Sequence, residues 1–210
     1  GRIIPAQEKA LLRLLRLSYQ DLLGYESPGG GFSAFGRGAD LTPTAWGLLV
    51  LTEIAPHTYI DPDLLARTRA FLSGQQAGDG AFRGPTETAY VALAMLTSDP
   101  ECLSTEDPAK PWTPALRTSR AACRKVVQRL EDAFSMVEGV DSYTLAWAAD
   151  ALVAAGGSHR VRAEALLDEL DRRAAIVGEG RERRVSFRPR GATLYGARGI
   201  SAEVETTAVV

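Results

Sequence analysis

The segment Thr86-Glu-Thr-Ala-Tyr-Val-Ala-Leu-Ala-Met95 begins with polar residues and then runs almost wholly apolar. The same pattern occurs three more times along the chain, at Thr42–Leu51, Ser142–Ala151 and Glu203–Val210. A helix that is apolar on all sides has no face for water, so it belongs in a protein interior. We therefore expect these four segments to be inner helices.

The segments between them predict helices with one charged face. We expect these outer helices over Pro5–Leu23, Asp61–Gln76, Pro114–Val137 and Ser158–Ile176. Inner and outer helices that alternate at a repeat of roughly 45 to 60 residues indicate stacked helical hairpins. A linear solenoid such as a tetratricopeptide array is the main alternative, but its repeats are shorter and more regular. The irregular spacing favours an all-α fold in which the hairpins close into an α/α toroid.

Two glycine-rich loops, Gly24–Asp40 and Ala77–Gly84, precede the first two inner helices. In each loop a Gly-x-Phe or Gly-Phe sequence comes shortly before the helix. Thr42 and Thr86 are predicted to be the N-caps of those helices, because a threonine hydroxyl accepts a hydrogen bond from a free N–H group of the first turn.

The region near 184–195 predicts a short β-hairpin. Arg184–Pro189 alternates between polar and apolar residues, as a strand does, and Ala192–Tyr195 could be its partner across a turn at 189–191. The fourth inner helix is expected to begin at Ser201.

Composition indicates an ordinary globular domain. The chain has 210 residues, is 45% hydrophobic and 24% charged, and carries a formal net charge of −2. Nucleic-acid binding normally requires a basic stripe, whereas the basic residues are massed here only at Arg181, Arg183, Arg184, Arg188 and Arg190. An uninterrupted apolar stretch of about 18 residues, which would predict a membrane span, does not occur. We expect residues 1–210 to be a single, partial domain that is truncated at both ends.

Few residues suggest chemistry. His57 and His159 lie near predicted helix ends, which favours surface or capping roles. Cys102 and Cys123 are too few for a disulfide framework, and whether they pair stays open. Asp79-Gly80 predicts a turn, since no phosphate-binding motif follows it.

Three further sets of residues have both a structural and a functional interpretation. The aromatic side chains of the inner helices could line a ligand site, but core packing is favoured, and Asp61 with Asp63 fits an ordinary helix cap. Glu203 and Glu205 are interpreted as favouring a helix start rather than as a catalytic pair, because residues two apart point in different directions. We assign no catalytic, cofactor-binding or metal-binding residue. The three aromatic residues of the inner helices that are considered as a possible ligand site are Trp46, Tyr90 and Trp147.

Four stretches together resemble the thioester-containing domain of alpha-2-macroglobulins and complement proteins. They match that family in its order and span nearly the whole chain. They are Gly30–Gly36 with Thr44–Trp46, Phe71–Phe82 with Glu87–Ala94, Tyr143–Gly156, and Ser201–Ala208.

The chain also departs from that family. The family closes an internal thioester between the Cys and Gln of a Cys-Gly-Glu-Gln motif, but here Leu103 follows Cys102 and Arg124 follows Cys123. Some complement members carry a His that relays the acyl group in a long insertion after the second glycine-rich loop. Here Arg83-Gly84-Pro85 leads almost directly into the helix, so no His corresponds.

The resemblance implies a domain of a large protease-trapping inhibitor, bacterial given its compact loops, and extracellular or periplasmic. Its implied partners are the trapped proteases and the other domains of the same chain. We expect this chain to supply the helical ring without the thioester, to need no cofactor and not to be an enzyme.

Two other functions remain open. Terpene cyclases and protein prenyltransferases share the α/α toroid, and Phe71–Phe82 resembles a cyclase Gln-Trp repeat. The acidic Asp-x-Asp-Asp motif of these cyclases and an evident Asp/Cys/His zinc set are missing, however. The other alternative is a non-enzymatic helical-repeat module that binds proteins.

Overall fold

The computed structural model describes residues 5–36, 38–178 and 184–210, and these are predominantly α-helical. Three outer helices, α3, α5 and α7, alternate along the chain with the inner helices α2, α4, α6 and α8, while α1 precedes them. The bounds are α1 Pro5–Leu23, α2 Leu41–Ile54, α3 Pro62–Gly74, α4 Pro85–Ser98, α5 Pro114–Ala133, α6 Ser142–Ala155, α7 His159–Arg173 and α8 Gly199–Val209. The prediction of an all-α fold with inner and outer helices is confirmed, but α1, which was expected to be an outer helix, lies at one end of the arc beside α2.

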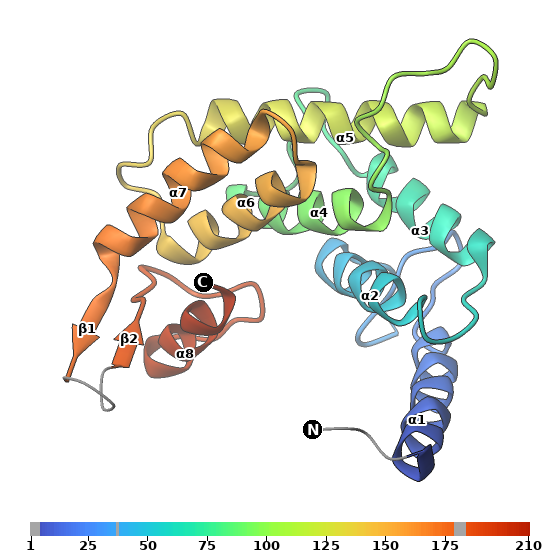
Figure 1. Ribbon diagram of the computed structural model, residues 1–210, viewed down its shortest axis with the longest axis horizontal. Helices are drawn as coiled ribbons and strands as arrows, with labels where there is room; N and C mark the ends of the chain where they lie inside the picture. The colour runs from blue at the N-terminus through green and yellow to red at the C-terminus, as the bar shows by residue number, and fades with distance from the viewer. Residues whose placement is uncertain (1–4, 37, 179–183) are drawn as a thin grey trace.

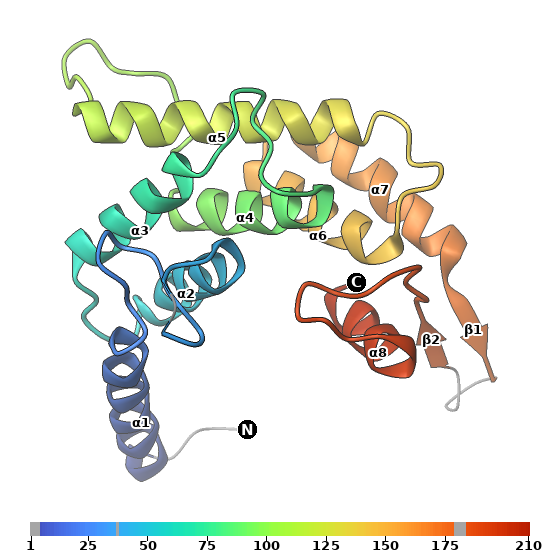
Figure 2. The same ribbon diagram turned by 180° about the vertical axis from the view of Figure 1, so that it is seen from behind.

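The inner helices lie side by side and form the wall of an arc (Figure 1). Helix α4 packs between α2 and α6, and α6 also contacts α8. The outer helices α3, α5 and α7 cover the outside of this wall, and α1 and α8 lie at the two ends of the arc, as the view from behind also shows (Figure 2). The described residues thus form an arc of inner and outer helices. Helices α1 and α8 lie at its opposite ends and are separated from each other.

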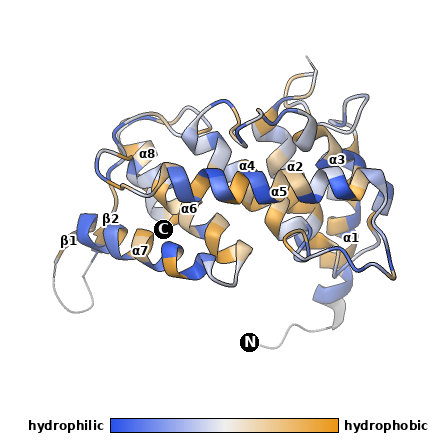
Figure 3. Ribbon diagram, turned by 90° about the horizontal axis from the view of Figure 1, so that it is seen from above, coloured by the Kyte–Doolittle hydropathy of each residue, from blue (hydrophilic) through white to orange (hydrophobic). Residues whose placement is uncertain are grey.

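Burial follows the hydrophobic pattern in α4, α5 and α7, whereas the largely apolar α8 buries only Ala202 and Thr206. Helix α4 has nine buried residues among its 14, whereas α7 buries only Ala163, Leu166 and Leu170. Hydrophilic and hydrophobic residues alternate along α5, which lies across the front of Figure 3. The buried stripe of α5 includes Val126, Val127 and Leu130. An outer helix therefore needs only one apolar face, while α4, in the middle of the wall, is covered on nearly every side.

Two clusters make up the buried core of the described residues. The larger one runs from α2 through α4 and α6 to α7 and includes both cysteines. The smaller one joins α1, the first glycine-rich loop and the α2–α3 region through Leu22, Phe32, Leu51, Ile60 and Leu64. The second cluster attaches α1 to the rest of the arc.

The helix starts differ from the predicted N-caps in two places. Asp40, not Thr42, caps α2, and its carboxylate accepts from the Leu41 N–H at 2.7 Å. Helix α4 begins at Pro85 with Gly84 as its N-cap, so Thr86 already lies inside the helix. The prediction for α3 is confirmed, since Asp61 caps it and Asp63 lies in its first turn.

The predicted hairpin is wrong in its pairing. Residues Arg184–Ser186 do form a strand, β2, but its antiparallel partner is β1, Ala175–Val177, with Ile176 opposite Val185. Helix α7 consequently ends at Arg173 and not at Ile176. The expected partner, residues 192–195, is instead part of a tight turn, in which Gly196 N–H donates to the Thr193 carbonyl at 3.0 Å. Helix α5 ends before the predicted Val137 as well.

The aromatic residues of the inner helices are not equally buried. Tyr90 is 2% exposed, as core packing requires, and Trp147 is half-buried. Trp46 is 47% exposed, so its assignment to the core is wrong. It lines a hollow beside α1 together with Leu22, Tyr25 and other residues.

Candidate functional site

A threonine of the inner helix is bonded to a phenylalanine of the preceding segment at three places in the arc. The N–H of Phe32 donates to Thr44 Oγ1 at 2.9 Å, and the N–H of Phe82 donates to Thr88 Oγ1 at 3.0 Å. At the far end of the arc, Phe187 N–H donates to a hydroxyl of α8, that of Thr207, at 3.1 Å. We call these three pairs the threonine clamps.

Each clamp hydroxyl also donates to the carbonyl four residues earlier in its own helix. Thr88 Oγ1 donates to the Gly84 carbonyl at 2.7 Å, and Thr207 Oγ1 donates to the Glu203 carbonyl at the same distance. A hydroxyl can donate one hydrogen bond and accept two, so a single threonine fixes both the loop and the helix. This accounts for Thr44 and Thr88 near the starts of α2 and α4, whereas Thr207 lies near the end of α8.

The two glycine-rich loops have the same backbone bonding. Ser27 N–H donates to the Gly31 carbonyl at 2.7 Å, and the N–H of Ala77 donates to the carbonyl of Ala81 at 2.9 Å. Gly30 and Gly80 occupy equivalent places in these turns, with φ of 94° and 88°. The two loops are therefore one structural unit used twice.

Both glycines lie against the backbone of an outer helix. A Cβ atom on Gly30 would be 2.5 Å from the Arg67 carbonyl of α3, and one on Gly80 would be 2.4 Å from the Lys125 carbonyl of α5. The positive φ disfavours other residues as well. Glycine thus allows each loop to touch the outer helix on one side and to be clamped to the inner helix on the other.

Helix α6 has a different contact at its start. Thr144 of α6 and Thr86 of α4 have their hydroxyl oxygens 2.6 Å apart, which links the first turns of two neighbouring inner helices. The N-cap of α6 is Asp141, whose carboxylate accepts from the Tyr143 N–H at 2.9 Å.

Tyrosine, tryptophan and glutamate side chains gather between α4, α6 and α8. The Tyr143 hydroxyl donates to Glu205 Oε1 at 2.6 Å, and the Thr193 hydroxyl donates to Glu205 Oε2 at 2.7 Å. The hydroxyls of Tyr90 and Tyr195 are 2.9 Å apart. We call these five residues the tyrosine–glutamate cluster. It ties the turn around residue 195 and helix α8 to the inner wall.

Trp147 packs against two of these tyrosines. Its ring centroid is 4.7 Å from that of Tyr90 and 5.9 Å from that of Tyr143, in edge-on geometry. Among the described residues the buried indole Nε1 atom has no hydrogen-bond partner. The aromatic residues therefore stabilise the junction of α4 and α6 by packing.

Burial makes the two inner tyrosines poor acids. Burial, and then the hydrogen bond to Tyr195, raises the pKa of Tyr90 above its usual value. Burial and the hydrogen bond to Glu205 raise the pKa of Tyr143 in the same way. Both phenols stay protonated at neutral pH, so they act as hydrogen-bonding groups and not as nucleophiles.

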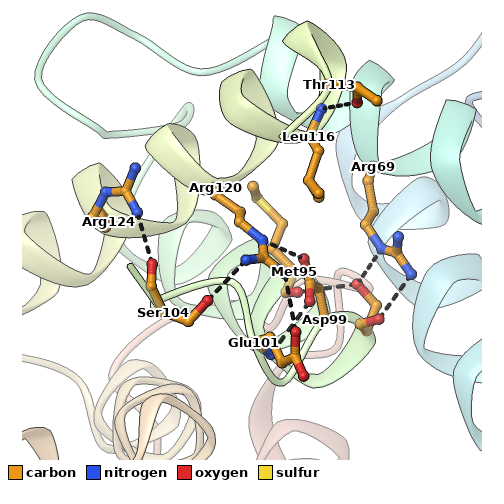
Figure 4. Close-up of polar contacts among 10 residues, drawn as sticks. Arg69, Met95, Asp99, Glu101, Ser104, Thr113, Leu116, Arg120 and Arg124 are labelled. Atoms are coloured by element: carbon orange, nitrogen blue, oxygen red, sulfur yellow. Dashed lines mark hydrogen bonds and ion pairs between the residues drawn. The ribbon is translucent and has the colours of Figure 1, made fainter. Parts of the chain in front are cut away.

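A second polar cluster holds the loop between α4 and α5. Arg120 reaches from α5 into the loop (Figure 4), where its Nη1 donates to Ser104 Oγ at 2.8 Å and its Nη2 to Glu101 at 3.4 Å. Its Nε lies 3.6 Å from Asp99 Oδ2. Trp112, near the other end of the loop, stacks 4.5 Å from the same guanidinium. Although Arg120 is only 6% exposed, its charge has both carboxylate and aromatic neighbours.

Within residues 5–36, 38–178 and 184–210, no group of three or more His, Cys, Asp or Glu side chains is arranged to hold a metal ion. Both clusters therefore connect segments of the fold, and each acid in them accepts hydrogen bonds or pairs with arginine.

Comparison with known families decides the identity of this fold. The family model described as the A-macroglobulin TED domain, where TED stands for thioester-containing domain, matches residues 1–210. The chain belongs to this family. The resemblance inferred from the four sequence stretches is thereby confirmed over the whole chain.

The histidines of this TED domain lie where the sequence suggested. His57 is exposed after α2. His159 is the first residue of α7, and its Nδ1 is 2.7 Å from Glu131 Oε1, so it links α7 to α5. Asp79 accepts from the Ala81 N–H in the second glycine-rich loop, which confirms the predicted turn.

The interpretation of Glu203 and Glu205 as residues of a helix start is wrong. Helix α8 of the TED domain begins at Gly199, so both glutamates lie further along it. Glu203 is 3.7 Å from Arg188, while Glu205 belongs to the tyrosine–glutamate cluster. The arginines of this region that the structure describes, Arg184, Arg188 and Arg190, are exposed, while Arg181 and Arg183 lie outside the described residues.

Sequence reasoning missed the tyrosine–glutamate cluster of the TED domain. Tyr143 and Glu205 are 62 residues apart, and no local spacing signals their contact. The threonine clamps had a partial signal, since a Phe in a glycine-rich loop preceded a Thr at the helix start twice. The intervals of 12 and 6 residues differ too much for the pairing to be read directly.

Proposed function

We propose that this TED domain belongs to an alpha-2-macroglobulin-like inhibitor that traps attacking proteases. The match of the whole chain to the A-macroglobulin TED family carries the proposal. In such an inhibitor a protease cuts a bait region elsewhere, the protein rearranges, and a thioester, where one is present, acylates the attacker. The helical domain shields the acyl group from water until then, because excluded water cannot hydrolyse a reactive species.

The proposed role of this chain is structural. The chain has no Cys-Gly-Glu-Gln sequence, and Cys102 and Cys123 are each 1% exposed. The inner tyrosines have raised pKa values and are engaged in hydrogen bonds. We propose that residues 1–210 supply the helical shell, that they are not an enzyme and that acylation depends on residues outside them.

The proposed setting follows from the family. A protein that intercepts foreign proteases works outside the cytoplasm, and we propose an extracellular or periplasmic, bacterial inhibitor. Its partners would be the trapped proteases and the other domains of the same large chain. No helix among the described residues has the length and apolar character needed to cross a membrane.

The test uses the whole protein that contains this domain together with a trypsin-class protease. After mixing, cleavage of a small peptide substrate and of a large protein substrate are measured in parallel. Trapping predicts that cleavage of the peptide persists while cleavage of the large substrate falls, because the trapped active site stays open only to small molecules. The same protease without the inhibitor is the control, since it cleaves both substrates. Equal loss of both activities, or of neither, would refute trapping.

The enzyme alternative is tested separately. A prenyltransferase or terpene cyclase would consume an isoprenoid diphosphate, and a prenyltransferase would also carry zinc. Product analysis after incubation with such a diphosphate, together with metal analysis of the purified chain, is expected to show neither turnover nor bound zinc. If the chain were only a protein-binding module, its protein should change cleavage of the small peptide and of the large protein substrate to the same extent.

A further inference from the structure

The two cysteines of the chain lie in segments that are held against each other. Cys102 lies in the loop after α4, where its N–H donates to the Asp99 carbonyl at 2.9 Å, and Cys123 lies in the middle of α5. Both belong to the larger core cluster, and each is 1% exposed. Each thiol is the largest influence on the pKa of the other, so the two side chains are neighbours, and both sulfurs are free.

Polar contacts hold the loop that carries Cys102 against α5, the helix that carries Cys123. Arg120 lies three residues before Cys123 in α5. Its guanidinium holds the loop to the helix by donating to Ser104 and Glu101. Trp112 closes over the same guanidinium. The loop that carries Cys102 is thereby pinned to the helix that carries Cys123 at several points (Figure 4).

The charges around the pair distinguish the two sulfurs. Asp99, Arg120 and Arg69 are the charged groups that act on them. The hydrogen bond from Cys123 lowers the pKa of Cys102, while the hydrogen bond to Cys102 and burial raise the pKa of Cys123. In the folded arrangement a thiolate is therefore favoured on Cys102 over Cys123, and a thiolate is the attacking species in disulfide exchange.

We propose that Cys102 and Cys123 form an intrachain disulfide when the protein folds in an oxidising compartment. This inference rests on the contact between the two thiols and does not depend on the proposed function. The oxidant is a disulfide of the glutathione type or of a thiol–disulfide oxidoreductase, the couples that set the redox poise of such compartments.

The exchange takes place in two balanced steps. The Cys102 thiolate attacks one sulfur of the oxidant, the oxidant's S–S bond breaks, and one thiolate leaves. The Cys123 thiol loses its proton and its sulfur attacks Cys102 in the mixed disulfide, which releases the second thiolate. One disulfide is reduced to two thiols and one is formed, so electrons and protons balance. Since both sulfurs are buried in the folded chain, the oxidant reaches Cys102 before the loop has packed fully onto α5, and the second step takes place as the loop closes and brings Cys123 to it.

The disulfide would tie the loop to α5 covalently. Cross-linking a loop of roughly 20 residues removes chain entropy from the unfolded state. For a protein of this size, we expect the oxidised chain to melt roughly 5–10 °C above the reduced chain. A buried pair of ordinary packing cysteines would show no such dependence on the redox buffer.

The test refolds the 210-residue chain in a glutathione redox buffer, quenches it with acid and alkylates it in denaturant. Intact mass and non-reducing peptide mapping then report the state of both sulfurs. The proposal predicts that the chain loses two hydrogens, takes up no alkylating reagent and yields one peptide pair linked through Cys102 and Cys123. The matched variants Cys102→Ala and Cys123→Ala should each leave one sulfur that reacts with the reagent.

A comparison of melting temperatures does not require either single-cysteine variant to fold. The wild-type chain is melted with and without a reductant, and the double variant Cys102→Ala with Cys123→Ala is the control. The melting temperature of the wild type should fall by roughly 5–10 °C on reduction. The melting temperature of the double variant should not change. Two alkylatable thiols after oxidative refolding, or oxidised species that are only intermolecular, would overturn the proposal.

Discussion

Replacing Thr88 by valine tests whether the threonine clamps hold the glycine-rich loops to the inner helices. Valine keeps the size and β-branched shape of threonine but removes the hydroxyl. The Phe82 N–H then loses its acceptor, and Phe82 is a buried residue. The Gly84 carbonyl is less affected, since the Thr88 N–H also donates to it at 2.8 Å. The cost of the change is therefore mainly that of one orphaned N–H group.

The size of that cost follows from the burial of the donor. A buried donor left without a partner destabilises a protein by about 1–3 kcal/mol. In a domain of this length, a change in the middle of that range lowers Tm by roughly 4–8 °C. We expect Thr44→Val to have an effect of the same size, because the Phe32 N–H depends on that hydroxyl in the same way.

The assay is urea unfolding followed by circular dichroism, with thermal melting as a second measure. Thr68→Val is the matched control, because Thr68 is fully buried and its hydroxyl donates to the Leu64 carbonyl of its own helix. That variant should be clearly less destabilising than Thr88→Val, since the Leu64 carbonyl keeps its place in the helix ladder and no buried donor loses its acceptor. If Thr88→Val were no more destabilising than Thr68→Val, the clamps would not have the role assigned to them.

Three further changes test other parts of the structure. Gly80→Ala places a Cβ against the backbone of α5 at positive φ and should cost about 2 kcal/mol or more in urea unfolding, whereas Gly78→Ala, with open space around it, should change little. Burial raises the pKa of Asp150, so its ionised form is disfavoured in the fold. Asp150→Asn should therefore raise the free energy of unfolding at pH 7, and unfolding measured across the acid range should show this gain disappearing below the unfolded pKa of about 3.9; a gain independent of pH would contradict the burial argument. Tyr143→Phe removes a hydrogen bond to a carboxylate and should cost about 1.5–3 kcal/mol in the same assay, while Tyr59→Phe, at a residue that is 78% exposed, should be neutral; equal effects of the two tyrosine changes would contradict a structural role for the cluster.

Local periodicity was enough to predict the layers of the fold. The all-round apolar character of α4 and α6 predicted inner helices, and the one-sided pattern of α5 predicted an outer one. These features depend on residues a few positions apart, whose relation is fixed by helix geometry. The same is true of the cap at Asp61, which is adjacent to the proline that begins α3.

The errors occurred where a distant partner decides the local structure. Thr86 was predicted to be the N-cap of α4, but the N-cap is Gly84, which has no side-chain cap bond. The hydroxyl that accepts from the preceding loop, from the Phe82 N–H, is that of Thr88. Ile176 looked like the end of an amphipathic helix, but it pairs with Val185 as part of β1. At Ile176 the local propensity was compatible with two structures, and the contact with Val185 selected between them.

The chemistry of the chain was harder to predict than its fold. Glu205 near Glu203 suggested a pair at a helix start, but its partners are Tyr143 and Thr193 from other segments. Trp46 has the same apolar surroundings in sequence as Tyr90, yet it is 47% exposed beside α1. Which face of an inner helix is covered depends on the neighbouring helices, and a single sequence does not specify their positions.

The most direct test of the central claim is the mass of the 210-residue chain after treatment with methylamine under native conditions. The claim is that these residues form the helical shell of a TED domain without an acyl group of their own. The account predicts no covalent uptake, because neither cysteine stands in a thioester motif and both are buried. A mass increase corresponding to one methylamine, together with the appearance of one new free thiol, would contradict it.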